Sequence, residues 1–153
     1  MVDITISRFW TKFTGKVKFT SDQLNESNRL LRVFAKQTDV FYAIQISYRG
    51  ELYLKFGIVH IRPFEQRYKE HLAEFAEDRD WRDICISHAM QCTEPAKVES
   101  EFKKSLFFKV NRYPVLPKSN GIGFHSEVIK LTKSVTASDI IKKLVDVAGS
   151  RII

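Results

Sequence analysis

Two strand-like segments separated by a short polar break, residues 40–46 and 52–59, constrain the fold of this chain more than any other feature. The first segment is rich in β-branched and aromatic residues, and the second alternates apolar side chains toward one face. The Arg49-Gly50 pair between them suits a tight turn. The sequence therefore predicts an antiparallel β-hairpin.

The turn also sets which residues face each other in this hairpin. If Tyr48 pairs with Glu51, the register carries Tyr42 opposite Gly57 and places Lys55 two residues before that glycine. Tyr42, Lys55 and Gly57 then share one face of the sheet. A glycine at this position leaves open space beside the tyrosine, which suits close approach by a ligand backbone.

Helical periodicity and turn signals surround the hairpin. We expect helices over residues 22–36, 64–75, 95–106 and 138–148, further strands over 83–90 and 124–131, and a loop over 111–123. The expected N-caps are Ser21, Thr93 and either Thr136 or Ser138, with Gly149 as the last C-terminal stop. The apolar stripe of the third helix is Val98, Phe102 and Leu106.

Two of these helices carry polar residues beside their apolar stripes. Arg67 and His71 are four residues apart, so they lie next to each other on one edge of a stripe. On the third helix, Glu99 lies about 60° from the stripe centre and Glu101 about 100° at 100° per residue. Glu99 is therefore the carboxylate expected against the fold, and Glu101 the more solvated one.

Composition limits the classes of protein to consider. The chain has 153 residues, is 44% hydrophobic and carries a formal net charge of +7, which indicates one folded basic domain. The charge favours a polyanionic partner, most simply DNA, although a basic domain without such a partner fits equally well. No apolar run is long enough to span a membrane, and residues 1–20 do not resemble a secretory signal.

The cysteines and histidines favour no zinc centre. Cys85 and Cys92 form no short metal-ligand pair and are expected as free thiols in a reducing compartment. His60, His88 and His125 lack ligand-like spacing. The expected location is intracellular, cytoplasmic or nuclear, with a virus particle left open.

The order of residues along the chain resembles the GIY-YIG nuclease superfamily. The matching elements, in chain order, are Val40-Phe41-Tyr42 for the first motif, Lys55-Phe56-Gly57 for a second motif of the Lys-x-Gly branch, Arg67 and His71 on the first helix, and Val98-Glu99 for the metal-binding glutamate. Phe41 replaces the usual isoleucine or valine. The family's asparagine has only Asn111 and Asn120 as candidates, and Glu127 is a candidate for an acidic residue of the phage-type branch.

This resemblance implies an α/β (α+β) domain with a small three-stranded antiparallel sheet flanked by helices. Residues 39–131 would form the nuclease-like domain, 1–38 an N-terminal basic and aromatic segment with a helix, and 132–153 a C-terminal helix. The implied activity is metal-dependent hydrolysis of DNA phosphodiester bonds. Specificity would come from the added segments, from a homodimer or larger assembly, or from a partner.

The resemblance also implies roles for the matching residues. Glu99 would hold Mg²⁺ or Mn²⁺, and Arg67 would bind a phosphate oxygen. Tyr42 would orient or deprotonate water, Lys55 would lower the pKa of that tyrosine, and His71 would support Arg67. Gly57, Lys103, Lys104 and Arg112 are the candidate DNA contacts.

Two other interpretations fit the same sequence. The first is a nuclease-like domain without activity that binds nucleic acid or serves as an assembly component, for instance in a virus particle. The second is an unrelated basic interaction module, which requires Tyr42 and Glu99 to lie far apart. Each candidate residue alone also has an ordinary structural explanation, such as a solvated edge lysine at Lys55. The joint order and the shared face favour the nuclease.

Overall fold

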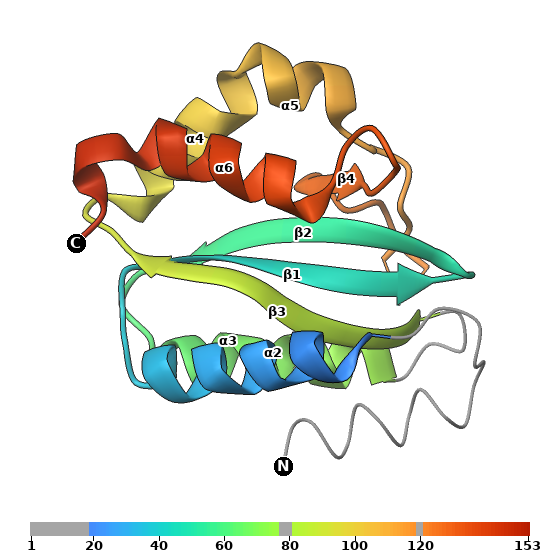
Figure 1. The fold of residues 1–153 in the computed structure, drawn as a ribbon, viewed down its shortest axis with the longest axis horizontal. Coiled ribbons are helices and arrows are strands. Elements are labelled where there is room, and N and C mark those ends of the chain that lie inside the picture. Colours follow the sequence, from blue (N-terminus) through green and yellow to red (C-terminus); the bar gives the residue numbers. More distant parts are fainter. Residues whose placement is uncertain (1–18, 77–80, 119–120) are drawn as a thin grey trace.

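The computed structural model describes residues 19–76, 81–118 and 121–153, so the aromatic and basic segment expected over residues 1–18 lies outside the described residues. A four-stranded antiparallel sheet lies between two layers of helices (Figure 1). The strands are β1 (Val40–Tyr48), β2 (Glu51–Val59), β3 (Trp81–Gln91) and β4 (Val128–Lys130). The helices are α2 (Ser21–Phe34), α3 (Phe64–Ala76), α4 (Pro95–Lys104), α5 (Leu106–Asn111), α6 (Ala137–Ala148) and the 3₁₀ turn η1 (Gly149–Arg151).

The mixed α+β class is as expected, but the sheet has four strands rather than three. The strand order is β3-β1-β2-β4. The extra strand is β4, which pairs with Tyr53–Lys55 at the edge of β2. The resemblance implied three strands, whereas the strand expected from the sequence over residues 124–131 is present as β4 and is only three residues long.

The hairpin register is confirmed. Tyr48 pairs with Glu51 and Tyr42 with Gly57, as the Arg49-Gly50 turn predicts. Arg49 and Gly50 have φ angles of 49° and 79°. Positive φ at both central residues is typical of the two-residue turn whose twist matches that of the flanking strands.

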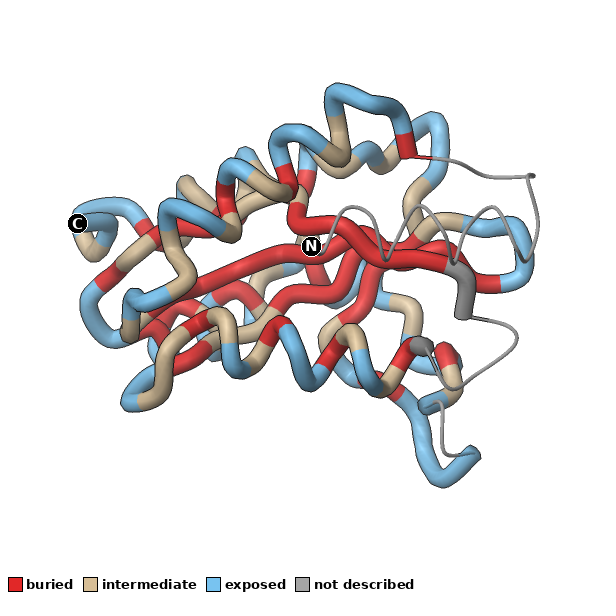
Figure 2. The backbone as a smooth tube through the Cα atoms, turned by 90° about the horizontal axis from the view of Figure 1, so that it is seen from below, coloured by how far each residue is buried: buried red, intermediate tan, exposed pale blue. Residues whose placement is uncertain are grey.

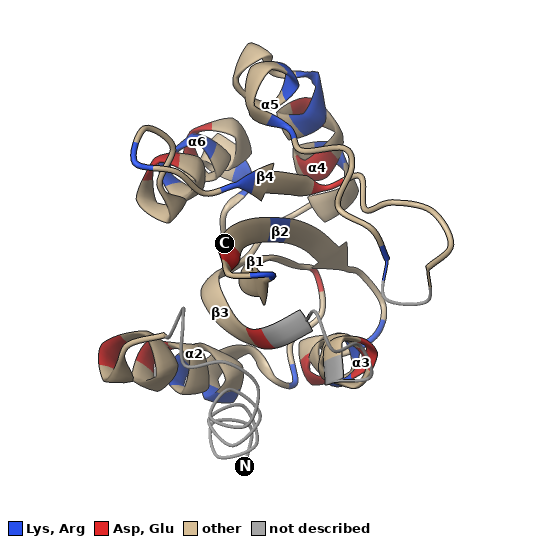
Figure 3. Cartoon of the chain, turned by 90° about the vertical axis from the view of Figure 1, so that its right-hand side faces the viewer, with Lys and Arg blue, Asp and Glu red and all other residues tan. Residues whose placement is uncertain are grey.

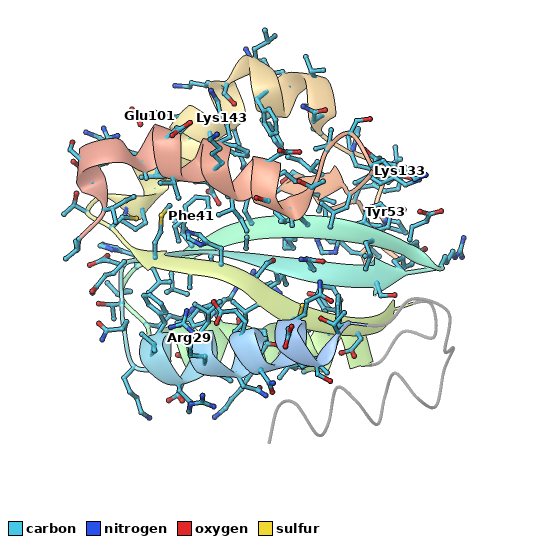
Figure 4. The ribbon with its side chains drawn as sticks, in the orientation of Figure 1. Arg29, Phe41, Tyr53, Glu101, Lys133 and Lys143 are labelled. Carbon is cyan, nitrogen blue, oxygen red and sulfur yellow. The ribbon has the colours of Figure 1, made fainter. Side chains whose placement is uncertain are left out.

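Strand β1 lies at the centre of the fold. All nine of its residues are buried, because α2 and α3 cover one face of the sheet and α4, α5 and α6 cover the other (Figure 2). Strands covered on both faces read as continuous apolar runs rather than alternating ones. Figure 4 shows Phe41 on β1 beneath the upper helices, where its ring stacks on Phe56 at 5.9 Å.

Helix ends differ from the sequence expectation at two caps. Thr20, not Ser21, caps α2, with its hydroxyl accepting from the backbone N–H of Gln23 in a capping box. Glu94, not Thr93, is the N-cap of α4, with a left-handed φ of 51° and no side-chain cap bond. The backbone N–H of Thr93 instead donates to the carbonyl of Arg151, so Thr93 pairs with the C-terminal turn and the N-cap lies one residue later, while α4 begins at Pro95 as expected.

The remaining helix ends follow the sequence more closely. Thr136 caps α6 in a capping box with Asp139, and Gly149 ends that helix. Of the helices in the described ranges, none is both long and apolar enough to cross a membrane. Cys85 and Cys92 are both free and buried.

The third expected helix is broken at Ser105, which corrects the predicted apolar stripe. Ser105 is extended, and its hydroxyl accepts from the backbone N–H of Phe108 and so caps a separate helix, α5. The break turns the chain, so Val98 and Phe102 are fully buried whereas Leu106 is 76% exposed.

Candidate active site

A cavity of about 130 Å³ lies at the edge of β2, just beyond the end of β4. Figure 3 views the sheet end-on, with α3 on one side of β2 and with α4 and β4 on the other. The backbone N–H of Phe56 donates to the carbonyl of Glu127, and beyond this bond Gly57 and Ile58 line the cavity. The short β4 therefore leaves an opening between the two helical layers.

The cavity brings together four of the five predicted catalytic residues. Tyr42 comes from β1, Lys55 from β2, Arg67 from α3 and Glu99 from α4 on the opposite helical layer. Gly57 lines the same cavity. Because Tyr42 and Glu99 share one cavity, the geometry that the unrelated interaction module required is not found.

The fifth residue, His71, lies behind Tyr42. Its Nε2 is 2.8 Å from the Tyr42 hydroxyl oxygen, and the Nε–H of Arg67 donates to that same oxygen at 3.3 Å. Burial lowers the pKa of His71 to about 3, and the Arg67 charge acts in the same direction. A neutral imidazole accepts the tyrosine proton at Nε2 and carries its own proton on Nδ1, which has no hydrogen-bond partner among the described residues.

Gly57 serves a different purpose from the expected one. A Cβ atom at Gly57 would lie 2.6 Å from the Tyr42 hydroxyl oxygen and 2.8 Å from its ring carbon Cζ. The open space that the glycine leaves is therefore filled by the tyrosine itself, not by a ligand. The ring is held there against Phe64, with 5.2 Å between ring centroids.

We expected Lys55 to lower the pKa of Tyr42. The pKa of Tyr42 is raised instead, and the charges that act on it most are not that of Lys55. Tyr42 is 1% exposed, and burial raises the pKa of its hydroxyl. The charges that oppose this rise are those of Arg67 and Arg62, whereas the Glu99 charge adds to it. Tyr42 is therefore a protonated phenol at neutral pH.

Lys55 forms part of a buried ion-pair network rather than a solvated edge. It is 7% exposed, and burial lowers its pKa while the charge of Glu127 opposes that shift. Glu127 accepts from Lys103 at 2.8 Å and from Lys55 at 3.4 Å. Burial alone would raise the pKa of Glu127, but Lys103, Lys55 and a hydrogen bond from Ser126 lower it to about 2.

Glu127 lines the cavity as well; the sequence named it as a candidate match to an acidic residue of the phage-type branch but assigned it no chemical role. One signal could have found it. Glu127 immediately precedes Val128, the edge-strand residue that pairs with Lys55. A carboxylate next to the residue that pairs with a strand lysine can form an ion pair with that lysine. Which residue pairs with Lys55 is known only from the observed register.

Glu99 is the carboxylate in the cavity that remains available. It is half-buried, and among the described residues its oxygens make no hydrogen bond and no ion pair. Burial raises its pKa, Glu127 adds to the rise, and Lys103 and Lys55 oppose it. Glu101 is more exposed, as expected, and pairs with Arg151 at 2.7 Å (Figure 4).

The predicted DNA contacts are only partly at this cavity. Lys103 reaches it through its bond to Glu127. Lys104 is exposed on α4, and Arg112 lies just after α5, where it forms a backbone bridge with Ile129; neither lines the cavity. The side chain of Asn111 donates to the Phe107 carbonyl instead of entering the site, and Asn120 lies outside the described residues.

The donor set fits a hydrated divalent cation held by one carboxylate. Over residues 19–76, 81–118 and 121–153, no group of three or more His, Cys, Asp and Glu side chains could hold a metal. A single carboxylate suits Mg²⁺ because this ion keeps most of its waters. The unpaired, half-buried Glu99 meets that requirement, since a bound cation would favour its ionised form.

Comparison of the chain with protein-family models, with curated proteins and with solved structures gives no significant match.

Proposed function

We propose that this chain is a divalent-metal-dependent endonuclease that hydrolyses phosphodiester bonds of DNA in this cavity. The observation that carries the proposal is the convergence of Tyr42, Arg67 and Glu99 from three separate elements onto one cavity. The order of these residues resembles that of the GIY-YIG nucleases. The net charge of +7 also favours a polyanionic substrate.

In this proposal Arg67 holds the scissile phosphate. Its Nε donates to Tyr42 and its Nη1 to Glu70 at 2.9 Å, which fixes the plane of the guanidinium. Its Nη2 makes no hydrogen bond to a described residue and is free to donate to a phosphate oxygen. Lys55 and Lys103 add positive charge beside it, and Glu127 holds both in place.

Tyr42 and His71 remove a proton from the attacking water. The Tyr42 oxygen accepts the water proton while the phenol proton passes to Nε2 of His71, 2.8 Å away. Before the transfer, burial keeps Tyr42 protonated and His71 neutral, because it raises the pKa of Tyr42 and lowers that of His71; the same burial disfavours the imidazolium that the transfer forms. Arg67 stabilises the oxygen during the transfer.

Glu99 would hold Mg²⁺ or Mn²⁺, which when bound supplies Lewis-acid stabilisation of the leaving oxygen. Glu99 lies on α4, in the other helical layer from Arg67. The phosphate would therefore be held between cationic groups on both sides. This arrangement suits an in-line attack, with water on the Tyr42 side.

The second candidate is a nucleic-acid-binding or assembly module without catalysis, for instance in a virus particle. One observation favours it. Glu127 already pairs with both Lys55 and Lys103, so each of these lysines has a partner without a substrate.

A plasmid-nicking assay separates these two candidates. Glu99→Gln keeps the size of the side chain and removes its charge, so we expect it to abolish Mg²⁺-dependent nicking with the fold intact. DNA affinity should stay equal or become slightly tighter, because one repulsion with phosphate is lost. Glu101→Gln on the same helix is the control and should nick like the wild type.

The outcomes are distinct. Nicking by the wild type that chelator and Glu99→Gln both remove would support the endonuclease. Equal nicking by wild type and Glu99→Gln would assign the cleavage to another source. DNA binding without any nicking in Mg²⁺ or Mn²⁺ would favour the inactive module.

A further inference from the structure

A second, larger cavity of about 410 Å³ adjoins the first. The two share Lys55, Arg67 and Glu127 as a common wall. The other lining residues are His71, Glu74, Lys118, Phe124, His125 and Ser126. Its volume falls within the range of small-ligand pockets, about 300–1,000 Å³.

The outer wall of this cavity is a loop held in place by backbone bonds. The N–H of His125 donates to the carbonyl of Leu116 at 2.8 Å, and Leu116 itself is fully buried. The N–H of Lys118 donates to the carbonyl of Gly123 at 3.1 Å, and Pro117 forms a bridge with Phe124. Lys118 and Phe124 are thus fixed on the cavity wall, across from α3.

The inner part of the cavity offers directional polar groups. His71 is 2% exposed, and its Nδ1 has no hydrogen-bond partner among the residues described. His125 Nε2 lies 3.6 Å from Glu74 Oε1, and burial lowers the pKa of His125 to about 4. Neutral His71 uses Nε2 to accept from Tyr42, so the group that it offers to this cavity is the Nδ1–H, beside the Glu74 carboxylate. Such groups match the edge of a nucleobase better than they match a bare anion.

The rim of the cavity offers an aromatic ring and positive charge. The Phe124 side chain is 58% exposed although it is large and apolar. Lys118, Arg67 and Lys55 provide three cations against Glu74 and Glu127, of which Glu127 is already paired with Lys55. Exposed aromatic rings beside basic residues are typical surfaces for stacking single-stranded bases.

We propose that this cavity binds one unpaired nucleotide of the DNA, next to the phosphate held by Arg67. The base stacks on Phe124, its edge faces His71 and Glu74, and Lys118 contacts the flanking phosphate. A base stacked on Phe124 inside the cavity is out of its base pair, so the nucleotide must be already unpaired or extruded from the duplex. This inference rests on the proposed function, and it gives the enzyme a preference for DNA with an unpaired base beside the cleavage point.

Fluorescence anisotropy on two labelled DNAs tests this inference. One is a fully paired duplex and the other carries a single unpaired nucleotide, and both are measured with Ca²⁺ at low salt. We expect the wild type to bind the second DNA about 10-fold more tightly. Phe124→Ala should remove that preference and leave affinity for the paired duplex within about twofold, whereas Phe124→Trp should keep it.

The matched control is Ile122→Ala, since Ile122 is a large apolar residue of the same loop, is 76% exposed and does not line the cavity. It should bind both DNAs like the wild type. Equal affinity of the wild type for the two DNAs, or a preference that Phe124→Ala retains, would overturn this inference and leave the proposed function standing. Absence of binding to either DNA would overturn the proposed function and this inference with it.

Discussion

Both edges of the sheet hold a cavity, but the two differ in the charge of the described residues that line them. At the β3 edge, a cavity of about 380 Å³ lies between α2 and α6, comparable in volume to the larger one beside β2. Its charged lining residues are Asp22 and Glu26, and no lysine or arginine among the described residues lines it. At the β2 edge, Lys55 and Arg67 line both cavities. Cavity size therefore does not separate the two edges, whereas the presence of cationic side chains, beside the carboxylates Glu74, Glu99 and Glu127, does.

The two edges also differ in whether a buried ionisable side chain has an ion-pair partner among the described residues. Asp83 on β3 is 5% exposed, and burial raises its pKa to about 8 although the backbone N–H of Ile84 donates to it. Lys55 on β2 is as deeply buried, but Glu127 and Lys103 form a network with it. Asp83 thus stays largely protonated at neutral pH, whereas Glu127 beside Lys55 stays ionised. A charge that remains ionised in a cavity wall is available to a substrate.

The largest difference between the edges should appear in the DNA cleavage rates of variants at two matched arginines. Arg67 and Arg29 each pair with a glutamate three residues away on a helix, Glu70 and Glu26. We expect Arg67→Gln to lower the DNA cleavage rate by about 100- to 1,000-fold, because it removes a donor to the reacting phosphate. Arg29→Gln, on α2 at the other side (Figure 4), should change the rate less than about twofold.

Single-turnover cleavage at saturating protein measures both variants. Comparable losses for Arg67→Gln and Arg29→Gln would show that charge in general, not the β2 edge, supports cleavage.

An intermediate effect should appear in stability, with opposite signs at the two edges. Asp83→Asn should raise the free energy of unfolding by about 1–3 kcal/mol at pH 8, because the buried carboxylate no longer has to be kept neutral. Glu127→Gln should lower it by about 2–3 kcal/mol, because Lys55 loses its partner. Urea denaturation at several pH values measures both.

The pH dependence gives each variant its own signature. The pKa of Asp83 is raised from 3.8 to about 8, so the folded state binds more protons between these values and stability falls as pH rises through them. The pKa of Glu127 is lowered from 4.5 to about 2, so its contribution is present above pH 4.5 and is lost as pH falls toward 2. Asp83→Asn should lose only the fall in stability between about pH 3.8 and 8, and Glu127→Gln only the fall below pH 4.5. The same change of pH dependence in both variants would contradict the contrast between the edges.

The smallest effect concerns salt. DNA affinity should fall as salt rises, because phosphate contacts release counterions. Lys118→Gln, at the β2 side, should reduce the slope of log affinity against log salt by about one. Lys142→Gln on α6, next to Ile141 of the β3-edge cavity, should leave the slope unchanged. Equal slopes for the wild type and both variants would remove Lys118 from the DNA path.

The sequence was sufficient for the parts of the site that depend on local rules. A two-residue turn and a period of two set the register that pairs Tyr42 with Gly57, and helical period placed Glu99 against the fold and Glu101 outside it. Arg67 and His71 followed from the same period. The hairpin strands and these helices are long, so their periods of two and of 3.6 residues are clear in the sequence.

The features that were missed depend on tertiary contacts. The N-cap at Glu94 follows from pairing between Thr93 and Arg151, which are far apart in the sequence. Glu127 enters the site only because β4 docks beside Lys55. Burial, which sets the pKa of Tyr42, cannot be read from charges that are neighbours in the sequence. The break at Ser105 is local, but a serine within an apolar period does not by itself end a helix.

The most direct measurement of the central claim is the single-turnover cleavage rate of Tyr42→Phe. The phenylalanine ring keeps its packing against Phe64 and over Gly57, and only the hydroxyl that contacts His71 and Arg67 is lost. We predict a rate at least about 100-fold below that of the wild type in Mg²⁺, with DNA affinity unchanged within about twofold. Cleavage by Tyr42→Phe at the wild-type rate, or no metal-dependent cleavage by the wild type on paired and unpaired DNA, would contradict the account.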